Sequence, residues 1–378
     1  MEALGAKEIK AYHDTAANFA KKEIKPDALE YDRFPFADFN RTVVDKLSAN
    51  EFLAPTLPEA LGGAGAGMRV LGAMLEEIAK EDASMAVLIL IQSMSYHILA
   101  ELGTEDMMKR WNILPEKGNP DLLSLPIYSD PEDLPDTIIA VKTKEGYSLK
   151  GAITYLPCLP VAKAAIIPAR IEGADNRALF IVETDRKGMA ISEPIVSLGF
   201  RGCPHADLTL DQVVVPEASL LGGEKGEAAF GVIAEKYRGP VSAIALGIIK
   251  GACQTAKNYA KERYQGGKQI IEHHMVRKML SDMVAWIDVI SSAAEHACQL
   301  SDNKKDPRSR SKLLSIQTIV TSAVTRATTD GVQVLGGYGY MHEYGQEKRM
   351  RDAKQLQAVF GSMPLKEMRV IDRDLSTN

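Results

Sequence analysis

Apolar and polar residues follow a helical period over the first part of the chain. From residue 7 to about 118, apolar residues recur every three or four positions, as in IKAYHDTAANFAKKEI and MRVLGAMLEEIAKEDASMAVLILIQSMSYHILAEL. This spacing places apolar side chains on one face of a helix. Stretches rich in Pro and Gly, such as APTLPEALGGAGAG, interrupt the period and predict loops. The pattern therefore predicts an N-terminal α-helical domain, residues 1–118.

The pattern changes to short β-rich runs between about 119 and 225. The runs are TIIAVKT, YSLKGAITYL, KAAIIPARI, RALFIVET and ADLTLDQVVV, and the turn signals KEGY, EGADN and DRKG separate them. No helical segment lies between these runs, so the pattern favours a small antiparallel barrel or sandwich over a doubly wound sheet. We expect a central β-domain, residues 119–225.

Helical periodicity returns after Pro216. Long helices are predicted at about 227–264, 272–301, 309–335 and 348–374. The last contains AVFGSMPL, residues 358–365, where Gly361 and Pro364 interrupt the helix. Four long helices with short links predict a C-terminal four-helix bundle domain, residues 226–378. The fold class is α+β, mostly α: helices, then a β-barrel or sandwich, then a bundle. The predicted helix at 272–301 carries an apolar stripe of Val276, Met279, Leu280, Met283, Ile287 and Ile290.

Composition indicates a globular protein and excludes several classes. With 378 residues and 46% hydrophobic residues, the chain can bury a large core. The net charge of -5, with interspersed signs, gives no basic surface for nucleic acid. The longest uncharged apolar run is too short to span a bilayer, and the N-terminus has no secretory apolar region. We expect a cytoplasmic protein with no membrane span.

The cysteines and glycine clusters match no metal or phosphate motif. The cysteines are widely spaced and are read as reduced thiols, and adjacent His273 and His274 point to different faces of a helix. GGAGAG lacks the spacing of a dinucleotide loop, and QGGK lacks the frame of a phosphate-binding loop. We therefore expect no metal site and no Rossmann fold.

The cluster GVQVLGGYGYMHEYGQEKRMRDAK is more informative. Two glycines at a helix end, followed by aromatic residues, allow a flat ligand or another backbone to approach closely. Taken alone, the cluster also fits a simple helix stop followed by a loop. Neighbouring motifs decide between these two interpretations.

Taken together, the motifs resemble the acyl-CoA dehydrogenase family, in the same order along nearly the whole chain. FAKKEIKPDALEYDRFPF and PEALGGAG resemble its opening helix and Pro-Glu-x-x-Gly-Gly loop. ELGTEDMMKRW is similar to the helix that enters the β-domain, and SLGFRGCPHADLTLDQVVVPEASLLG to the Leu-Gly-x-Arg-Gly signature. AKERYQGGKQIIEHHMVRKMLSDM and VQVLGGYGYMHEYGQEKRMRDAK resemble the two flavin-contacting segments of the C-terminal domain. The resemblance implies the same three-part fold that periodicity predicts.

The resemblance also implies FAD bound between the subunits of a tetramer. Arg263 would pair with the FAD pyrophosphate across the subunit interface, because an Arg fork suits two phosphates. Ser129 would bond the flavin ring near N1 and O2, and Tyr155 would cover the ring. For each position the alternative is an ordinary surface or core residue. The cofactor-binding candidates are Ser129, Tyr155, Arg263, Gln265, Gln333, Gly336, Gly337 and Ser362.

The implied substrate is an acyl-CoA thioester. Arg238 falls on the arginine near the thioester, and Arg308 on a position that can meet CoA phosphate. Gln92 and Tyr96 lie on a helix that lines the acyl pocket in the family, although core packing is the favoured role for both. The substrate-binding candidates are Gln92, Tyr96, Arg238, Arg308 and Gly361.

The catalytic positions depart from the family pattern. Most members carry a glutamate base before the Gly-Thr or Gly-Ser that follows RDAK, and here Phe360 precedes Gly361 and Ser362. A variation places the base before the arginine of the first bundle helix, where this chain has Tyr237 before Arg238. A phenol is protonated at neutral pH. Tyr237 is therefore a base only if activated, with Arg238 as the candidate support.

Residues near the implied flavin ring depart as well. Pro157 replaces a hydroxyl residue near flavin N5, and Gly266 replaces a Phe that packs on the cofactor. Proline cannot offer a backbone N–H to a ligand. Together these changes weaken the case for a standard flavin pocket.

Three functions stay open. In the first, the chain is an FAD-dependent acyl-CoA dehydrogenase whose base lies elsewhere. In the second, it is a flavoprotein that processes acyl-CoA without net redox change. In the third, it is a non-catalytic subunit that supplies half of a composite cofactor site to an active homologue. This third function predicts that the chain keeps Arg263, Gln333 and Gly337, because these residues would serve the FAD of a neighbouring subunit. A homotetramer or a heterotetramer is expected, and electron-transferring flavoprotein is a candidate electron acceptor.

Overall fold

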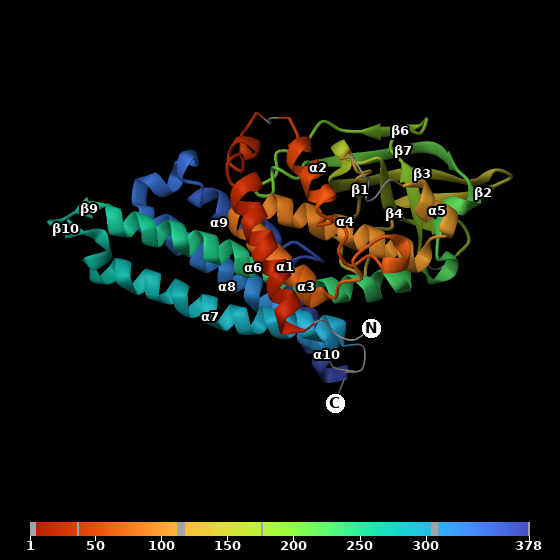
Figure 1. The fold of residues 1–378 in the computed structure, drawn as a ribbon. Coiled ribbons are helices and arrows are strands. Elements are labelled where there is room, and N and C mark those ends of the chain that lie inside the picture. Colours follow the sequence, from red (N-terminus) through yellow and green to blue (C-terminus); the bar gives the residue numbers. More distant parts are fainter. Residues whose placement is uncertain (1–4, 36–37, 112–117, 175–176, 304–308, 377–378) are drawn as a thin grey trace.

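The N-terminal region is helical, as the periodicity predicts. The computed structural model describes residues 5–35, 38–111, 118–174, 177–303 and 309–376 (Figure 1). Asn40 accepts a hydrogen bond from the backbone of Val43, and Asp82 accepts one from Ser84, so polar caps start two of the helices. The elements are α1 (Ala6–Phe19), η1 (Ala20–Ile24), η2 (Glu30–Asp32), α2 (Arg41–Ala49), η3 (Glu59–Leu61), α3 (Met68–Glu81), α4 (Ala83–Leu102) and α5 (Glu105–Arg110).

The central strands form one eight-stranded sheet within the described residues. Its order is β6-β7-β3-β2-β4-β5-β8, and β1 pairs with β4. The β1–β4 and β2–β4 pairs are parallel and the other pairs are antiparallel, so the sheet is mixed where we expected purely antiparallel pairing. The strands are β1 (Leu123–Ser124), β2 (Ile138–Thr143), β3 (Gly146–Pro157), β4 (Ala164–Ile171), β5 (Arg177–Glu183), β6 (Met189–Ile191), β7 (His205–Val215) and β8 (Leu220–Leu221).

The C-terminal region is a helical bundle. Its long helices are α6 (Gly226–Glu262), α7 (His274–Asp302) and α8 (Ser309–Leu335), and a small hairpin of β9 (Tyr264–Gln265) and β10 (Lys268–Gln269) joins the first two. The predicted fourth helix is two helices, α9 (Gln346–Leu356) and α10 (Met363–Ser376). Helix α9 ends at Leu356, and Gly361 lies in the loop that follows. Pro364 does not interrupt a helix but lies in the first turn of α10, where a missing N–H costs no hydrogen bond. Short 3-10 helices η4 (Leu159–Val161), η5 (Glu217–Ser219), η6 (Gly223–Lys225), η7 (Ile270–Glu272), η8 (Gly336–Tyr340) and η9 (His342–Tyr344) complete the chain.

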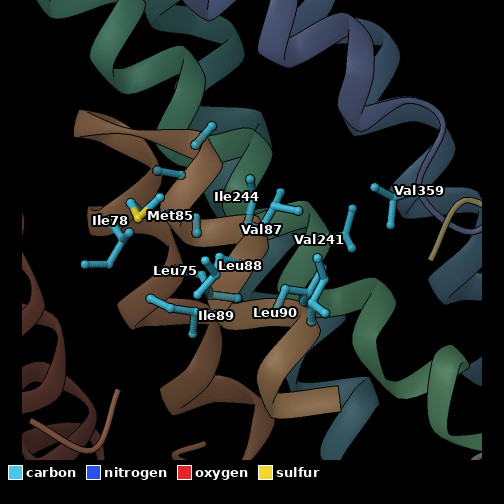
Figure 2. Packing of buried hydrophobic residues seen from close by; sticks show 14 of the residues in the cluster. Leu75, Ile78, Met85, Val87, Leu88, Ile89, Leu90, Val241, Ile244 and Val359 are labelled. Carbon is cyan, nitrogen blue, oxygen red and sulfur yellow. The ribbon is translucent and has the colours of Figure 1, made fainter. Parts of the chain in front are cut away.

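The N-terminal helices and the bundle share one hydrophobic core. Leu75 of α3, Leu88 of α4, and Val241 and Ile244 of α6 belong to this cluster, and Figure 2 shows them side by side with Val359. A second cluster lies inside the sheet and includes Leu149, Phe180 and Val213, among others. The shared core fixes the loop after α9 against α4 and α6, because Val359 and Phe360 belong to it.

Helix α4 is apolar on nearly all faces. By length and composition it could cross a membrane, but 89% of its most apolar window is buried inside the fold. A helix that is hydrophobic all round is expected in the core of a large protein. The predicted domain boundaries stay predictions: α5 ends at Arg110, β8 ends at Leu221 and α6 begins at Gly226.

Candidate functional site

The loop after α9 places Phe360 in the core. Its side chain is fully buried, its φ is +59°, and its N–H donates to the carbonyl oxygen of Ile127 at 2.7 Å. The left-handed region is unfavourable for a bulky residue, so the surrounding packing must hold this conformation. Gly361 follows with a φ of +107°. The position that carries a carboxylate in most of the resembled family therefore holds a buried aromatic ring.

Arg238 lies against this ring. Its guanidinium carbon is 5.6 Å from the centre of Phe360, and only 1% of the residue is exposed. It donates to Gln317 Oε1 at 2.6 Å and to Glu235 Oε1 at 2.9 Å. Arg373 also donates to Glu235, at 3.0 Å. Burial disfavours the charged carboxylate, yet Arg238 and Arg373 outweigh it and lower the pKa of Glu235. Glu235 is thus a charge partner, not a free base.

Lys366 supports the same loop from α10. Its ammonium nitrogen lies 2.6 Å from the carbonyl oxygen of Gln357 and 3.0 Å from that of Val359. Gln317 donates to the Val359 carbonyl as well, at 2.9 Å. Burial, together with the positive charge of Arg238, lowers the pKa of Lys366 to about 7. The loop is therefore held by a buried amine whose charge is unfavourable.

Tyr237 is not arranged as a base. Its ring is fully buried, and its hydroxyl donates to the carbonyl oxygen of Ser93 at 2.8 Å, with Thr56 Oγ1 and His97 Nδ1 each 3.3 Å away. Burial raises the pKa of Tyr237 further above its ordinary value. Arg238, the candidate support for Tyr237, donates to Glu235 and Gln317.

The predicted acyl-pocket residues hold the backbone of the sheet. Gln92 donates to the carbonyl oxygen of Leu123 at 3.0 Å and accepts from its N–H at 2.8 Å. Tyr96 donates to the carbonyl oxygen of Asp121 at 2.6 Å. Both side chains are fully buried, in agreement with the packing role. The predicted CoA-phosphate contact, Arg308, lies outside the described residues.

Aromatic side chains gather at the end of the sheet that carries Tyr155. The rings of Tyr155 and His205 stack with centres 4.7 Å apart, and Tyr128 Oη lies 2.8 Å from His205 Nε2. Gln355 of α9 donates to Tyr155 Oη at 2.7 Å. Burial lowers the pKa of His205 to about 4, so its imidazole is neutral. The half-buried Ser129 follows Tyr128 directly, and its N–H donates to Pro126.

Tyr128, His205 and Gln355 were not predicted from the sequence. His205 follows the Arg-Gly signature at 201–202, Gln355 follows RDAK, and Tyr128 precedes Ser129. Adjacency to these motifs is the signal that could have found them.

An open cleft lies at the end of the bundle that carries the β9–β10 hairpin. It has a volume of about 630 Å³ and is formed by the end of α6, the β9–β10 hairpin and the end of α8. The guanidinium carbon of Arg263 is 5.6 Å from the ring centre of Tyr338, and among the described residues it has no carboxylate partner. The structure thus brings together five of the predicted cofactor residues: Arg263, Gln265, Gln333, Gly336 and Gly337.

The cleft suits the pyrophosphate and adenylate end of FAD. A Cβ built on Gly336 or Gly337 would meet no atom within 4 Å, so open space lies beside both. The exposed Arg263 offers a planar fork of donors to phosphate oxygens. Figure 1 shows β9 and β10 far from the sheet, at the opposite end of the elongated molecule. Arg263 and Tyr155 of one chain therefore lie in different parts of the molecule.

Two clusters could coordinate a metal by their donor types. They are His13 with Glu76 and Glu77, and Asp32 with His342 and Glu347. In each cluster cations already neutralise the carboxylates: Lys80 binds Glu77 at 3.1 Å, Lys250 binds Glu76, and Arg351 binds both acids of the second cluster. A metal ion would have to displace these partners.

The three-part fold, with N-terminal helices, a central sheet and a C-terminal helical bundle, is the fold of acyl-CoA dehydrogenases. The models of the acyl-CoA dehydrogenase N-terminal and C-terminal domains match residues 6–115 and 230–373. The chain belongs to the acyl-CoA dehydrogenase family.

Relatives match over most or nearly all of their length. Cyclohexane-1-carbonyl-CoA dehydrogenase of Geobacter metallireducens is 28% identical, with 98% of each chain covered. Butyryl-CoA dehydrogenase of Megasphaera elsdenii has the same fold, with a TM-score of 0.88 and 24% identity over 99% of this chain and 100% of that chain. Glutaryl-CoA dehydrogenase of Mycobacterium smegmatis, solved with FADH2, has a TM-score of 0.88 and 18% identity over 99% and 96%. At these identities the solved structures support the fold alone.

Proposed function

We propose that this chain is a subunit of an oligomeric acyl-CoA dehydrogenase-type flavoprotein, and that it holds the adenylate end of a neighbouring subunit's FAD. Its own residues do not abstract the α-proton of an acyl-CoA. The observation that carries the proposal is the contrast between the two ends: an open cleft at Arg263, and a buried aromatic ring at Phe360.

The cleft supports the binding part of the proposal. Arg263 would hold the pyrophosphate, Gln333 would bond the adenylate, and the glycines at 336 and 337 would let the ligand approach the backbone. FAD, when bound, supplies a hydride acceptor for α,β-dehydrogenation of a thioester. This chain contributes a fixed cation and hydrogen-bond donors, which position the cofactor but transfer no proton.

The loop at 358–362 supports the non-catalytic part. A general base needs a proton acceptor within hydrogen-bond reach of the substrate. Phe360 has none, Tyr237 donates its proton to a carbonyl, and Glu235 is ion-paired with Arg238 and Arg373. The side chains at both family base positions are thus unsuited to remove an α-proton at neutral pH.

Purification with and without a partner tests the proposal. The chain is expressed alone and together with an acyl-CoA dehydrogenase homologue that carries the glutamate, and flavin content is read from the absorption spectrum. We expect little flavin in the chain alone and a flavin-loaded hetero-oligomer on co-expression. A saturated acyl-CoA should bleach the flavin of this complex, and removal of the glutamate from the co-expressed homologue should abolish the bleaching. A chain that alone binds flavin and is bleached by acyl-CoA would refute the proposal.

A second candidate function is α,β-dehydrogenation by the chain itself, with Asp130 as the base. Asp130 is buried, and among the described residues Arg369 is its one ion-pair partner, with Nε 3.2 Å from Oδ2, whereas Glu235 has two. Asp130 Oδ2 is 3.0 Å from the place where a Cβ on Gly361 would stand. A carboxylate thus lies against the loop that carries the base in most of the family. Loss of bleaching in Asp130→Asn, with the fold intact, would favour this function.

A further inference from the structure

Two buried cysteines lie in direct contact where β3 ends and β7 begins. The sulfur atoms of Cys158 and Cys203 are 3.2 Å apart, and neither residue is exposed to solvent. A disulfide requires about 2.05 Å between the sulfurs, so they need to approach by roughly 1.1 Å. We propose that Cys158 and Cys203 form a redox-active dithiol, which a peroxide oxidises reversibly to an intramolecular disulfide.

The backbone holds both cysteines in place for this bond. In the β3–β7 ladder Pro157 pairs with His205, so Cys158 directly follows one paired residue and Cys203 lies just before the other. The N–H of Cys203 donates to Phe200 at 2.8 Å, and the carbonyl of Cys158 accepts from Val161 at 3.0 Å. Since these contacts fix the main chain, side-chain rotation is the movement that closes the remaining gap.

The sulfur of Cys158 and the sulfur of Cys203 contact each other directly. Among the described residues, Gln92 Nε2 also lies near the Cys158 sulfur, at 4.0 Å. The short thiol contact and burial both raise the pKa of Cys158, so its thiolate is rare. We therefore expect slow oxidation, by an oxidant small enough to enter the core, and little reaction with bulky thiol reagents in the folded state.

The reaction is balanced with hydrogen peroxide as the oxidant. One thiol attacks the peroxide and becomes a sulfenic acid, with release of one water. The second thiol then attacks that sulfur, the S–S bond forms, and a second water leaves. The two sulfurs lose two electrons together, and the peroxide gains them. A dithiol such as dithiothreitol reverses the bond by thiol–disulfide exchange.

The bridge would act on the aromatic cluster. Tyr155 lies three residues before Cys158, and His205 two residues after Cys203, and their rings stack at 4.7 Å. Cross-linking residues 45 positions apart also removes conformations from the unfolded chain. Oxidation should therefore stabilise the β3–β7 junction and alter the environment of the Tyr155 ring.

The chain offers matched controls. Cys253 and Cys298 are also free and buried, but among the described residues neither sulfur contacts another cysteine. Burial raises the pKa of both thiols, as it does for Cys158. Cys253 and Cys298 therefore show how a buried thiol reacts when no second cysteine lies beside it.

Peroxide treatment of the folded full chain tests the proposal. After quenching, the chain is unfolded in an alkylating reagent and mapped by mass spectrometry without reduction. We expect a peptide cross-linked through Cys158 and Cys203, lighter by two hydrogen atoms, and two fewer alkylated thiols. Dithiothreitol should restore all four. Cys253→Ser and Cys298→Ser should keep the cross-link, and Cys158→Ser and Cys203→Ser, each checked by circular dichroism, should lose it.

Several results would overturn the proposal. One is oxidation of exposed methionines while Cys158 and Cys203 stay fully alkylated. Another is conversion of either cysteine to a sulfinic acid without a cross-link. A cross-link that survives in Cys203→Ser would place the bond elsewhere. The first two of these results come from the wild-type chain, so the proposal can be refuted even if a cysteine variant fails to fold.

Discussion

The guanidinium carbon of Arg238 lies 5.6 Å from the ring centre of Phe360. A cation over an aromatic face is attractive, and more so when both are desolvated, as here. Arg238 is also held by Glu235 and Gln317, so the ring lies against an ion pair that is already satisfied. The pair joins α6 to the loop after α9, so Phe360 makes a buried packing contact between these two elements.

Tyr237→Phe should lower stability and leave acyl-CoA chemistry unchanged. The hydroxyl donates to the buried carbonyl of Ser93, and loss of such a bond costs about 0.5–1.5 kcal/mol. Urea unfolding measures the loss of stability. Flavin bleaching by acyl-CoA in the co-expressed complex measures whether the acyl-CoA is still oxidised. Abolished bleaching with unchanged stability would instead identify Tyr237 as the base.

Arg263→Ala should reduce flavin binding without loss of stability. The side chain is exposed and has no carboxylate partner among the described residues, so its removal breaks few internal contacts. A lost charge-assisted bond to phosphate weakens affinity by about 10- to 100-fold. Equilibrium dialysis of FAD against the co-expressed complex measures this loss. The matched control is Arg277→Ala, an exposed arginine outside the cleft, and an equal loss there would point to a non-specific charge effect.

Gly361→Ala should destabilise the fold by about 1–3 kcal/mol, because the residue has a φ of +107° and the new Cβ would lie 3.0 Å from Asp130 Oδ2. Gly337→Ala is its control, since a Cβ there meets no atom within 4 Å. Thermal unfolding should separate the two. Gly337→Ala should keep the melting temperature and lose flavin in the complex. Equal melting temperatures for both variants would contradict the strained loop.

Lys366 should make stability depend on pH. Its pKa falls from 10.5 to about 7 in the folded state. Between these values the unfolded chain binds more protons than the folded chain, so the free energy of unfolding gains a contribution that rises with pH. Below about pH 7 both states hold the proton and this contribution to the slope disappears.

Lys366→Met isolates that contribution. Urea unfolding of both proteins between about pH 6 and pH 10 should show a shallower rise for the variant above pH 7. Lys354, exposed on α9, provides Lys354→Met as the control, which should keep the wild-type slope. Parallel curves for wild type and Lys366→Met would show that the buried amine keeps its ordinary pKa.

Much of the fold was predictable because its cause is local. The 3.6-residue period located α6, α7 and α8 to within a few residues, and turn signals located the strands. The pairing of β2 and β4 was not predictable. A parallel pair brings together strands that are separated by β3, and alternation along a strand does not identify its neighbour.

The residues of the cleft at Arg263 were predictable, but the cleft itself was not. Family resemblance assigned Arg263, Gln333 and Gly337 to one ligand, and the cleft contains all three. The ring contact of Tyr155 with His205 and its hydrogen bond with Gln355 were not expected, because these residues lie 50 and 200 positions away and meet Tyr155 through the sheet and α9.

The sequence by itself determined the order of helices and strands, the family, and the absence of a carboxylate at positions 237 and 360. These follow from residue identity and short-range periodicity. Only the tertiary structure decided what surrounds these positions: Phe360 is buried against Arg238, Lys366 is buried beneath the loop with a lowered pKa, and Cys158 contacts Cys203. Burial and long-range contact set the charge and reactivity of a side chain, and neither is encoded in its local neighbours.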